Sequence, residues 1–220
     1  MTHAEQEYIK QIYLGIVNGH RPMQTRLLAE MVGAKPSSAT DMVKKLTIKG
    51  LLDYRKSHGF ELSEKGMQHA LQIVRRHRLW ELFLTDHLKI DWKEVDAIAS
   101  ELQCISSNLM INNLEAYLGF PVYDPHGELI PGAMGQLLET ERMEIYDLKV
   151  GQQAKVTGFR DSGKPFLAYI EKLGLLIGTN FKVSSLIDYN HSIEIEAVKK
   201  SPFIITKETA QKIYVDVIKK

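Results

Sequence analysis

Residues 25–62, TRLLAEMVGAKPSSATDMVKKLTIKGLLDYRKSHGFEL, contain the pattern that decides the fold. Two short segments with apolar residues at helical spacing, 25–33 and 36–50, each end in glycine, which commonly terminates a helix. We expect Thr25 to cap the first helix, and a serine beside the conformationally fixed Pro36 to cap the second. Two short helices joined by a tight turn predict a helix-turn-helix.

A β-hairpin is predicted directly after the second helix. The strand-like runs 51–55 and 60–62 are joined by a turn that ends in Gly59, and the tip of this turn carries basic residues. A glycine at that position is typical of a hairpin turn. A further helix is predicted over 5–18, where apolar residues recur every three or four positions. Three helices followed by a basic hairpin predict a winged helix-turn-helix.

The rest of the chain predicts a helical part and then a β-rich part. A long helix is expected from Ser63, its cap, to about residue 87. Its apolar stripe changes face near 75–78, so the helix either bends there or is buried on two sides. One further helix is expected over 92–119, and a Pro/Gly-rich loop over 121–135. The short alternating runs that follow predict a small β-barrel.

These elements predict an α+β protein in three parts: a winged helix-turn-helix at 1–63, a helical domain at 64–140 and the barrel at 141–220. The single cysteine, Cys104, has no second cysteine with which to form an internal disulfide. The N-terminus has no signal-peptide pattern, and no apolar run reaches the length of a membrane span. We therefore expect a cytoplasmic protein without a membrane partner.

The formal net charge of +1 hides a strong asymmetry along the chain. Residues 1–76 contain 12 Lys/Arg and 7 Asp/Glu, residues 77–150 contain 5 and 13, and residues 151–220 contain 11 and 7. The basic first part favours an anionic partner, and the acidic middle part favours cations.

The second helix of a helix-turn-helix enters the major groove, where short polar side chains reach phosphates and base edges. Lysines and arginines on that helix and on the wing pair with phosphates. The predicted contacts with double-stranded DNA are Lys35, Pro36, Ser37, Ser38, Thr40, Lys44, Lys45, Arg55 and Lys56. Helix capping by the serines and a solvated face for the lysines are the alternative explanations.

Potential metal donors occur at helical spacing in the acidic part. His77 and Glu81 are four residues apart and share one helix face. Further donors are available on the next predicted helix and on the first one: Asp96, Ser100, Gln103, Cys104 and Glu7. Such donors suit a first-row divalent ion such as Fe, Mn or Zn. The alternative is a surface salt bridge between His77 and Glu81, with the cysteine as a small core residue.

The order of these elements resembles the metal-dependent regulators of the diphtheria toxin repressor and manganese transport regulator family. The motifs that carry the resemblance are KPSSATDMVKKL (35–46), KGL (49–51), LSEKG (62–66), RHRL (76–79) and DPHG (124–127). The resemblance implies a homodimer, formed through residues of about 64–120, that binds palindromic operators. It also implies repression of metal-uptake genes when Mn²⁺ or Fe²⁺ is bound, and an SH3-like fold for the last domain.

The resemblance further implies two metal sites. The positions that match the first are His77, Glu81 and Asp96. Those that match the second are Glu7, Ser100, Gln103 and Cys104. Asp96 replaces a histidine and remains a competent ligand, whereas Ser100 and Gln103 are weak replacements for charged ligands. Lys10 stands where the manganese branch has an acid, and its ammonium would oppose a second metal ion.

The sequence therefore favours a metal-responsive DNA-binding transcriptional repressor with a partly degenerate second metal site. One alternative is a metal-independent DNA-binding regulator, in which Lys10 neutralises Glu7 or Glu81. Another is a winged-helix protein-interaction module in iron transport. An enzyme is not expected, because no nucleophile with its base, phosphate-binding loop or pair of catalytic carboxylates stands out.

Overall fold

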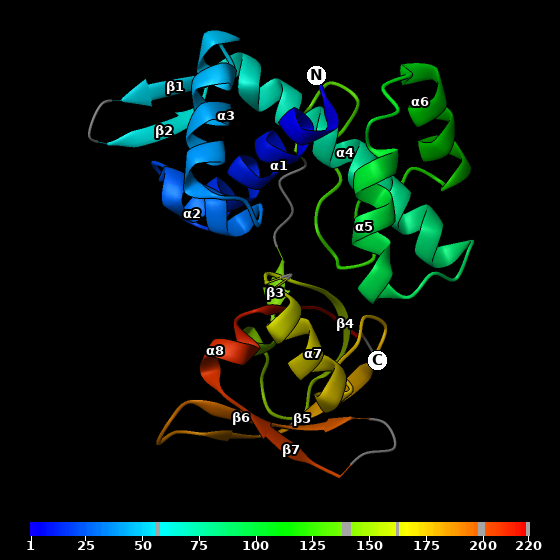
Figure 1. The fold of residues 1–220 in the computed structure, drawn as a ribbon. Coiled ribbons are helices and arrows are strands. Elements are labelled where there is room, and N and C mark those ends of the chain that lie inside the picture. The colour runs from blue at the N-terminus through cyan, green and yellow to red at the C-terminus, as the bar shows by residue number, and fades with distance from the viewer. Residues whose placement is uncertain (56–57, 138–141, 162, 198–200, 219–220) are drawn as a thin grey trace. The chain divides into compact units, whose positions relative to one another are not determined.

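The computed structural model describes residues 1–55, 58–137, 142–161, 163–197 and 201–218, which divide into two compact units (Figure 1). The first unit comprises Met1–Val122 and Ile130–Leu138, and the second comprises Tyr123–Leu129 and Glu139–Lys220. Among the described residues, two hydrophobic cores lie in the first unit and one lies in the second. The predicted division at 63/64 and 140/141 stays a prediction.

The first half of the first unit is a winged helix-turn-helix, as predicted. Its elements are α1 (His3–Val17), α2 (Thr25–Met31), α3 (Pro36–Ile48), β1 (Leu52–Arg55) and β2 (Gly59–Leu62). The two strands are antiparallel, with Leu52 opposite Leu62. Ile9 and Ile12 from α1 meet Leu28, Leu46 and Phe60 in the core, and all five side chains are fully buried. Burial of these apolar side chains is what holds the three helices and the hairpin together.

The predicted helix caps at α2 and α3 are wrong. Thr25 is the first residue of α2 rather than its cap, and the cap position is taken by Gln24 without a side-chain hydrogen bond. Helix α3 begins at Pro36, with Lys35 as its cap residue, so neither serine caps it. The proline ring already has the helical φ and lacks the N–H that a cap would have to satisfy.

The wing is fastened to the segment before α2. The backbones of Met23 and Phe60 exchange two hydrogen bonds, of 2.9 and 3.0 Å. Gly59 adopts a positive φ of 98°, and a Cβ at this position would lie 2.3 Å from the carbonyl oxygen of Met23. Only glycine therefore permits both the turn and this close backbone approach.

The helical half of the first unit consists of α4 (Glu64–Asp86), α5 (Trp92–Leu102) and α6 (Asn108–Tyr117). The prediction of one helix over 92–119 is wrong, because α5 ends at Leu102. Ser107 caps a new helix, since its hydroxyl oxygen accepts a hydrogen bond from the amide of Met110. Helix α4 is buried on more than one side, since every residue over 73–81 except Arg76 is buried. No helix in the described ranges combines the length and the apolar character needed to cross a membrane.

The second unit is an antiparallel sheet of six strands in the order β3-β8-β4-β5-β6-β7. Its elements are β3 (Met143–Glu144), η1 (Ile145–Asp147), β4 (Gln153–Phe159), α7 (Lys164–Leu173), β5 (Asn180–Ile187), β6 (Ser192–Ala197), β7 (Phe203–Ile205), α8 (Lys207–Ala210) and β8 (Ile213–Val217). Ile170 of α7 is fully buried in the core of this unit. The predicted α+β class, with helices first and a β-rich end, is confirmed.

The segment Tyr123–Leu129 folds with the second unit although residues of the first unit precede and follow it. The amide of Phe159 in β4 donates a 3.1 Å hydrogen bond to the carbonyl oxygen of His126. Next to it, a Cβ on Gly127 would lie 2.2 Å from the Cα of Gly158. The two glycines therefore let the segment and β4 touch backbone to backbone.

A buried carboxylate joins α1 to α3. Glu5 is fully buried, and its Oε1 lies 2.6 Å from Lys49 Nζ and 2.9 Å from Lys45 Nζ. Hydrogen bonds from Lys49, Lys45 and the Thr2 backbone lower the pKa of Glu5 from its ordinary 4.5 to about 2. The carboxylate is therefore ionised throughout the neutral and mildly acid range, and it ties the first turn of α1 to the end of α3.

We expect Glu5→Gln to destabilise the first unit by about 1–2 kcal/mol at pH 7, because two half-exposed ammoniums lose their acceptor. A carboxylate whose pKa is lowered on folding stabilises the protein fully above its ordinary pKa and loses this effect as the pH falls toward the folded value. The difference between wild type and variant should therefore shrink as the pH falls from 4.5 to about 2. Urea unfolding followed by circular dichroism measures it.

Glu30→Gln is the matched control, since Glu30 pairs with Arg26 and both side chains are exposed. This control should change stability by less than about 0.5 kcal/mol. Equal stability of wild type and Glu5→Gln at pH 7 would show that the buried carboxylate does not hold α3.

Candidate metal centre and nucleic-acid interface

The first turn of α3 presents polar side chains to solvent. Ser37, Ser38 and Thr40 are exposed, as are Lys35 and Pro36 at the helix start. Thr40 Oγ1 donates a 2.8 Å hydrogen bond to the Pro36 carbonyl oxygen. The N-terminus of a helix carries free N–H groups and a partial positive charge, so this turn favours an anionic partner.

The predicted phosphate-binding side chains differ in their surroundings. Lys44 and Arg55 are exposed, and Lys44 Nζ lies 3.6 Å from Asp41 in a surface pair. Lys45 is half-exposed and pairs with the buried Glu5. Lys56 lies outside the described residues. Contacts of all nine predicted residues with DNA stay predictions.

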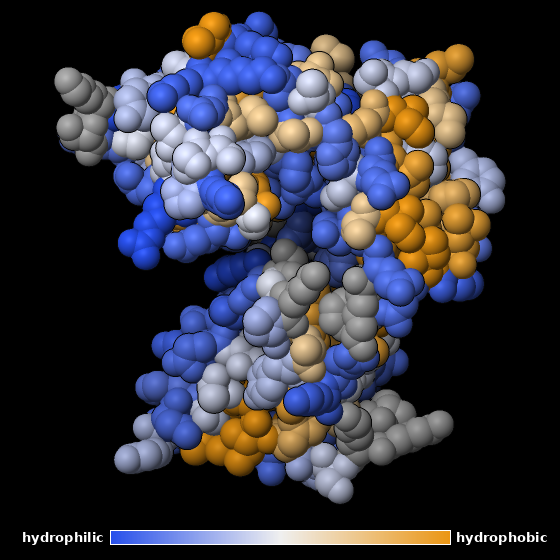
Figure 2. All heavy atoms as spheres, viewed as in Figure 1, coloured by the Kyte–Doolittle hydropathy of each residue, from blue (hydrophilic) through white to orange (hydrophobic). Residues whose placement is uncertain are grey.

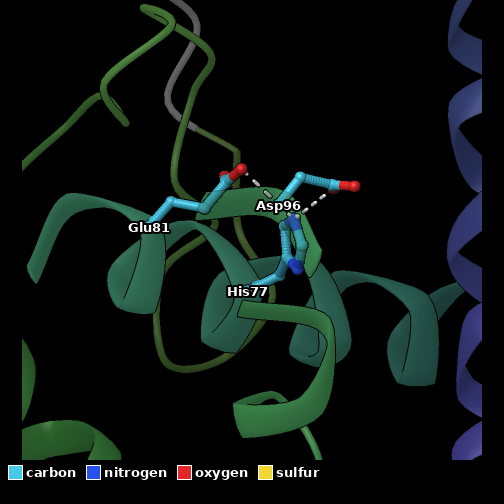
Figure 3. A group of neighbouring side chains, drawn as sticks. All are labelled: His77, Glu81 and Asp96. Carbon is cyan, nitrogen blue, oxygen red and sulfur yellow. Dashed lines mark ion pairs between the residues drawn. The ribbon is translucent and has the colours of Figure 1, made fainter. Parts of the chain in front are cut away.

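His77, Glu81 and Asp96 form a compact cluster between α4 and α5 (Figure 3). His77 Nε2 lies 3.4 Å from Glu81 Oε1 and 3.3 Å from Asp96 Oδ1. The side chains of His77 and Glu81 are 9% and 5% exposed, whereas that of Asp96 is 64% exposed, so the cluster opens to solvent on the α5 side. The alternative of a salt bridge between His77 and Glu81 is correct in its partners but wrong in its location, because the pair is buried rather than at the surface.

The charge state of His77 is set by burial and by its two carboxylate partners, which act in opposite directions. Burial disfavours the imidazolium of His77, but hydrogen bonds to Asp96 and Glu81 and the charge of Glu81 outweigh it and raise the pKa of His77 to about 9. At neutral pH a proton therefore sits between the two carboxylates. A metal ion has to displace this proton, since it binds neutral imidazole.

The residues of this cluster fit a first-row divalent cation. One ligand atom from each of the three side chains lies within 4.8 Å of the others, and one nitrogen with two carboxylate oxygens suits Mn²⁺, Fe²⁺ or Zn²⁺. His77 Nδ1 is buried and makes no hydrogen bond within the described part of the chain. The acceptor that usually fixes the ring of a metal-binding histidine is thus missing from these residues.

The second predicted set, Glu7, Gln103 and Cys104, is arranged differently. Among the described residues, neither Glu7 nor Cys104 belongs to a group of three close His, Cys, Asp or Glu side chains. Gln103 Nε2 lies 3.4 Å from Glu7 Oε2, so its amide points hydrogens at the carboxylate. The Lys10 ammonium lies 3.2 Å from the same oxygen. This set does not fit a divalent cation, because its one carboxylate is already paired with an ammonium and with an amide donor.

Two polar residues, the buried Glu5 and the partly buried Arg76, were not identified as important from the sequence. Glu5 was missed because a glutamate in a first helical turn is usually solvated. Arg76 was quoted only within a motif, yet its Nε donates a 2.6 Å hydrogen bond to the Gln103 carbonyl oxygen and a guanidinium nitrogen lies 3.3 Å from Gln6 Oε1. The only sequence signal for the role of Glu5 is the i, i+4 spacing of Lys45 and Lys49, which puts two ammoniums on one helix face where they can share a carboxylate.

Three family models match the chain in succession. Residues 1–60 match the N-terminal DNA binding domain of the iron dependent repressors, and residues 63–132 match their metal binding and dimerisation domain. Residues 143–217 match the FeoA domain.

Individual relatives agree with these models. The chain is 34% identical to the HTH-type transcriptional regulator MntR of Lysinibacillus sphaericus, over 52% of this chain and 94% of that protein. It is 31% identical to the iron-dependent repressor IdeR of Mycobacterium tuberculosis, over 60% of this chain and 57% of the relative's length. A solved manganese-dependent transcriptional repressor in complex with manganese superposes with a TM-score of 0.74 at 28% identity, covering 97% of this chain and 99% of that chain.

We expect His77→Ala to weaken Mn²⁺ binding by at least about tenfold, because the cluster loses its only nitrogen ligand. Isothermal titration calorimetry at constant pH measures the affinity. His69→Ala is the matched control, since His69 is an exposed histidine of the same helix. Equal Mn²⁺ affinity of wild type and His77→Ala would exclude this cluster as the ion site.

Proposed function

Because the chain belongs to the family of iron-dependent repressors, we propose that it is a metal-responsive transcriptional repressor of metal-uptake genes, acting with Mn²⁺ or Fe²⁺. The family consists of DNA-binding regulators, so the protein is not an enzyme. The observation that carries the proposal is the His77–Glu81–Asp96 cluster, which lies within residues that match the family's metal-binding domain.

The cluster connects two helices through one imidazole and two carboxylates. His77 and Glu81 belong to α4 and Asp96 belongs to α5. A bound divalent ion would supply the positive charge that holds both carboxylates on one centre. His77 would give up its proton on binding, and Asp96, the exposed member, would have to be ordered. Metal binding would therefore stabilise the packing of α5 on α4.

The DNA-binding surface proposed here comprises the start of α3 and the wing. Ser37, Ser38 and Thr40 are short enough to reach base edges from a helix that lies in the major groove. Lys35, Lys44 and Arg55 are exposed and suited to phosphates, whereas Glu5 competes for Lys45.

A homodimer is the assembly that the helical half supports. Exposed apolar side chains gather at α6 and just after it: Leu109, Met110, Tyr117 and Phe120. Figure 2 shows an apolar patch over α5 and α6 in the first unit. An apolar patch of this kind favours association, and this stretch lies within the residues that match the family's dimerisation domain. Two copies related by a twofold axis would read a palindromic operator.

A second candidate is a regulator that binds DNA without metal. One observation favours it: the Lys10 ammonium already neutralises Glu7, at a distance of 3.2 Å. The two candidates predict a different effect of metal ions on the affinity for DNA, so one assay distinguishes them.

The proposal is tested by selecting binding sites from a pool of random duplexes with the full chain, and then measuring affinity for the selected duplex with Mn²⁺, with Fe²⁺ and with a chelator. We expect tighter binding with either ion and a steep salt dependence, with a log–log slope of about −0.9 per phosphate contacted. Equal affinity with ion and with chelator would favour the metal-independent regulator. No binding to any duplex at low salt would instead indicate a protein-interaction module.

We expect Lys44→Ala to weaken binding to all duplexes by a similar factor and to make the salt slope shallower by about one, because one phosphate contact is lost. Fluorescence anisotropy over a series of salt concentrations measures both quantities. Lys182→Ala is the control, since Lys182 is an exposed lysine of the second unit. An unchanged slope for Lys44→Ala would remove this residue from the proposed interface.

A further inference from the structure

We infer that the Lys10 side chain is a built-in cation that takes the place of a second metal ion between α1 and α5. The inference rests on the proposed function only in its assumption that a first ion binds at His77, Glu81 and Asp96. It concerns the residues Glu7, Ser100 and Gln103, which do not fit a metal ion in this structure.

The ammonium of Lys10 lies in a cage of oxygens. Only 3% of the side chain is exposed, although lysine is rarely buried without a partner. Nζ donates a 2.9 Å hydrogen bond to Ser100 Oγ and lies 3.2 Å from Glu7 Oε2. Asp96 Oδ1 lies 3.9 Å away on the same side. A hydroxyl and two carboxylates from two helices thus converge on one positive charge.

The same arrangement excludes a divalent ion. An ion among these oxygens would lie beside an ammonium that cannot leave, because its side chain is buried, and like charges repel strongly where water is excluded. Gln103 adds its amide hydrogens toward Glu7, and its Oε1 is buried without a hydrogen bond within the described part of the chain. Gln11 Nε2 donates a further 2.8 Å hydrogen bond to Glu7 Oε1. Three donors therefore already surround the Glu7 carboxylate without a metal ion.

The built-in cation also belongs to a series of contacts that ends at α3, the second helix of the helix-turn-helix. Lys10 joins α1 to α5. Glu5 on the same helix pairs with Lys45 of α3 and with Lys49, the residue that follows this helix. The chain of contacts from α5 through α1 to α3 is thus complete without a second ion. Lys10 and His77 also approach the same oxygen, Asp96 Oδ1, so the ion at the first site binds next to a fixed positive charge.

The first experiment counts Mn²⁺ ions per protomer in wild type, Lys10→Glu and Lys65→Glu. We expect one ion in wild type and two in Lys10→Glu, because a third carboxylate replaces the ammonium and the cage then needs a hard cation. Lys65→Glu makes the same charge change at an exposed site and should bind one ion. Two ions in wild type would overturn the inference and leave the proposed function intact.

The second experiment measures hydrogen exchange of α1 amides in a chelator, so that no ion contributes. We expect the α1 amides of Lys10→Met to exchange at least about tenfold faster than those of wild type, because Glu7 loses its cation. Lys65→Met should leave the exchange rates of the α1 amides unchanged. Lys10→Glu should then regain slow exchange when Mn²⁺ is added. Unchanged α1 exchange in Lys10→Met would overturn the inference.

The two ideas fail separately. If wild type binds no ion at all, the proposed metal response is wrong, but rapid α1 exchange in Lys10→Met would still support the built-in cation. If Lys10→Glu remains at one ion and shows no Mn²⁺-dependent protection of α1, the cage is not an ion site and the inference is wrong.

Discussion

One buried carboxylate couples the first helix to the recognition helix, and the DNA-binding half of the molecule depends on it. Thr2 and Glu5 form a capping box at the start of α1, which sets the direction of the carboxylate. Lys45 and Lys49 lie one helical turn apart, so both ammoniums reach it from the same face of α3. Rotation of α3 about its axis would break both pairs. The ion pairs of the buried Glu5 therefore join α1 to the helix whose first turn carries Ser37 and Ser38.

The elements that local rules describe well were predicted from the sequence. Period and turn residues identified α1 to α4 and the wing, because their apolar faces and glycines follow local patterns. The break at Ser107 was missed, since the apolar spacing continues across it and a serine cap outweighs that spacing. The short β3 and the closing strand β8 were missed as well, because their pairing partners are distant in sequence.

The candidate site was predicted in its residue types but only partly in its geometry. The i, i+4 spacing of His77 and Glu81 placed these two side chains together, and Asp96 joins them as the resemblance implies. The i, i+3 spacing of Glu7 and Lys10 places these two side chains on one helix face. No spacing rule could add Ser100 and Asp96, since their approach to Lys10 depends on how α1 packs against α5. The positive charge between carboxylates thus differs in kind at the two places. Between Glu81 and Asp96 it is the proton on His77, which a metal ion can displace. Beside Glu7 it is the ammonium of Lys10, which is attached to the chain.

Because the segment Tyr123–Leu129 belongs to the second unit, the two units cannot be separated by a single cut in the chain. Its backbone touches β4 at Gly127 and Gly158, yet the chain on either side of it belongs to the first unit. A stop codon near residue 140 would remove β4 and leave these seven residues without the strand that shapes them. Removal of the last domain alone would therefore leave a segment of the second unit without its backbone partner, between two parts of the first unit.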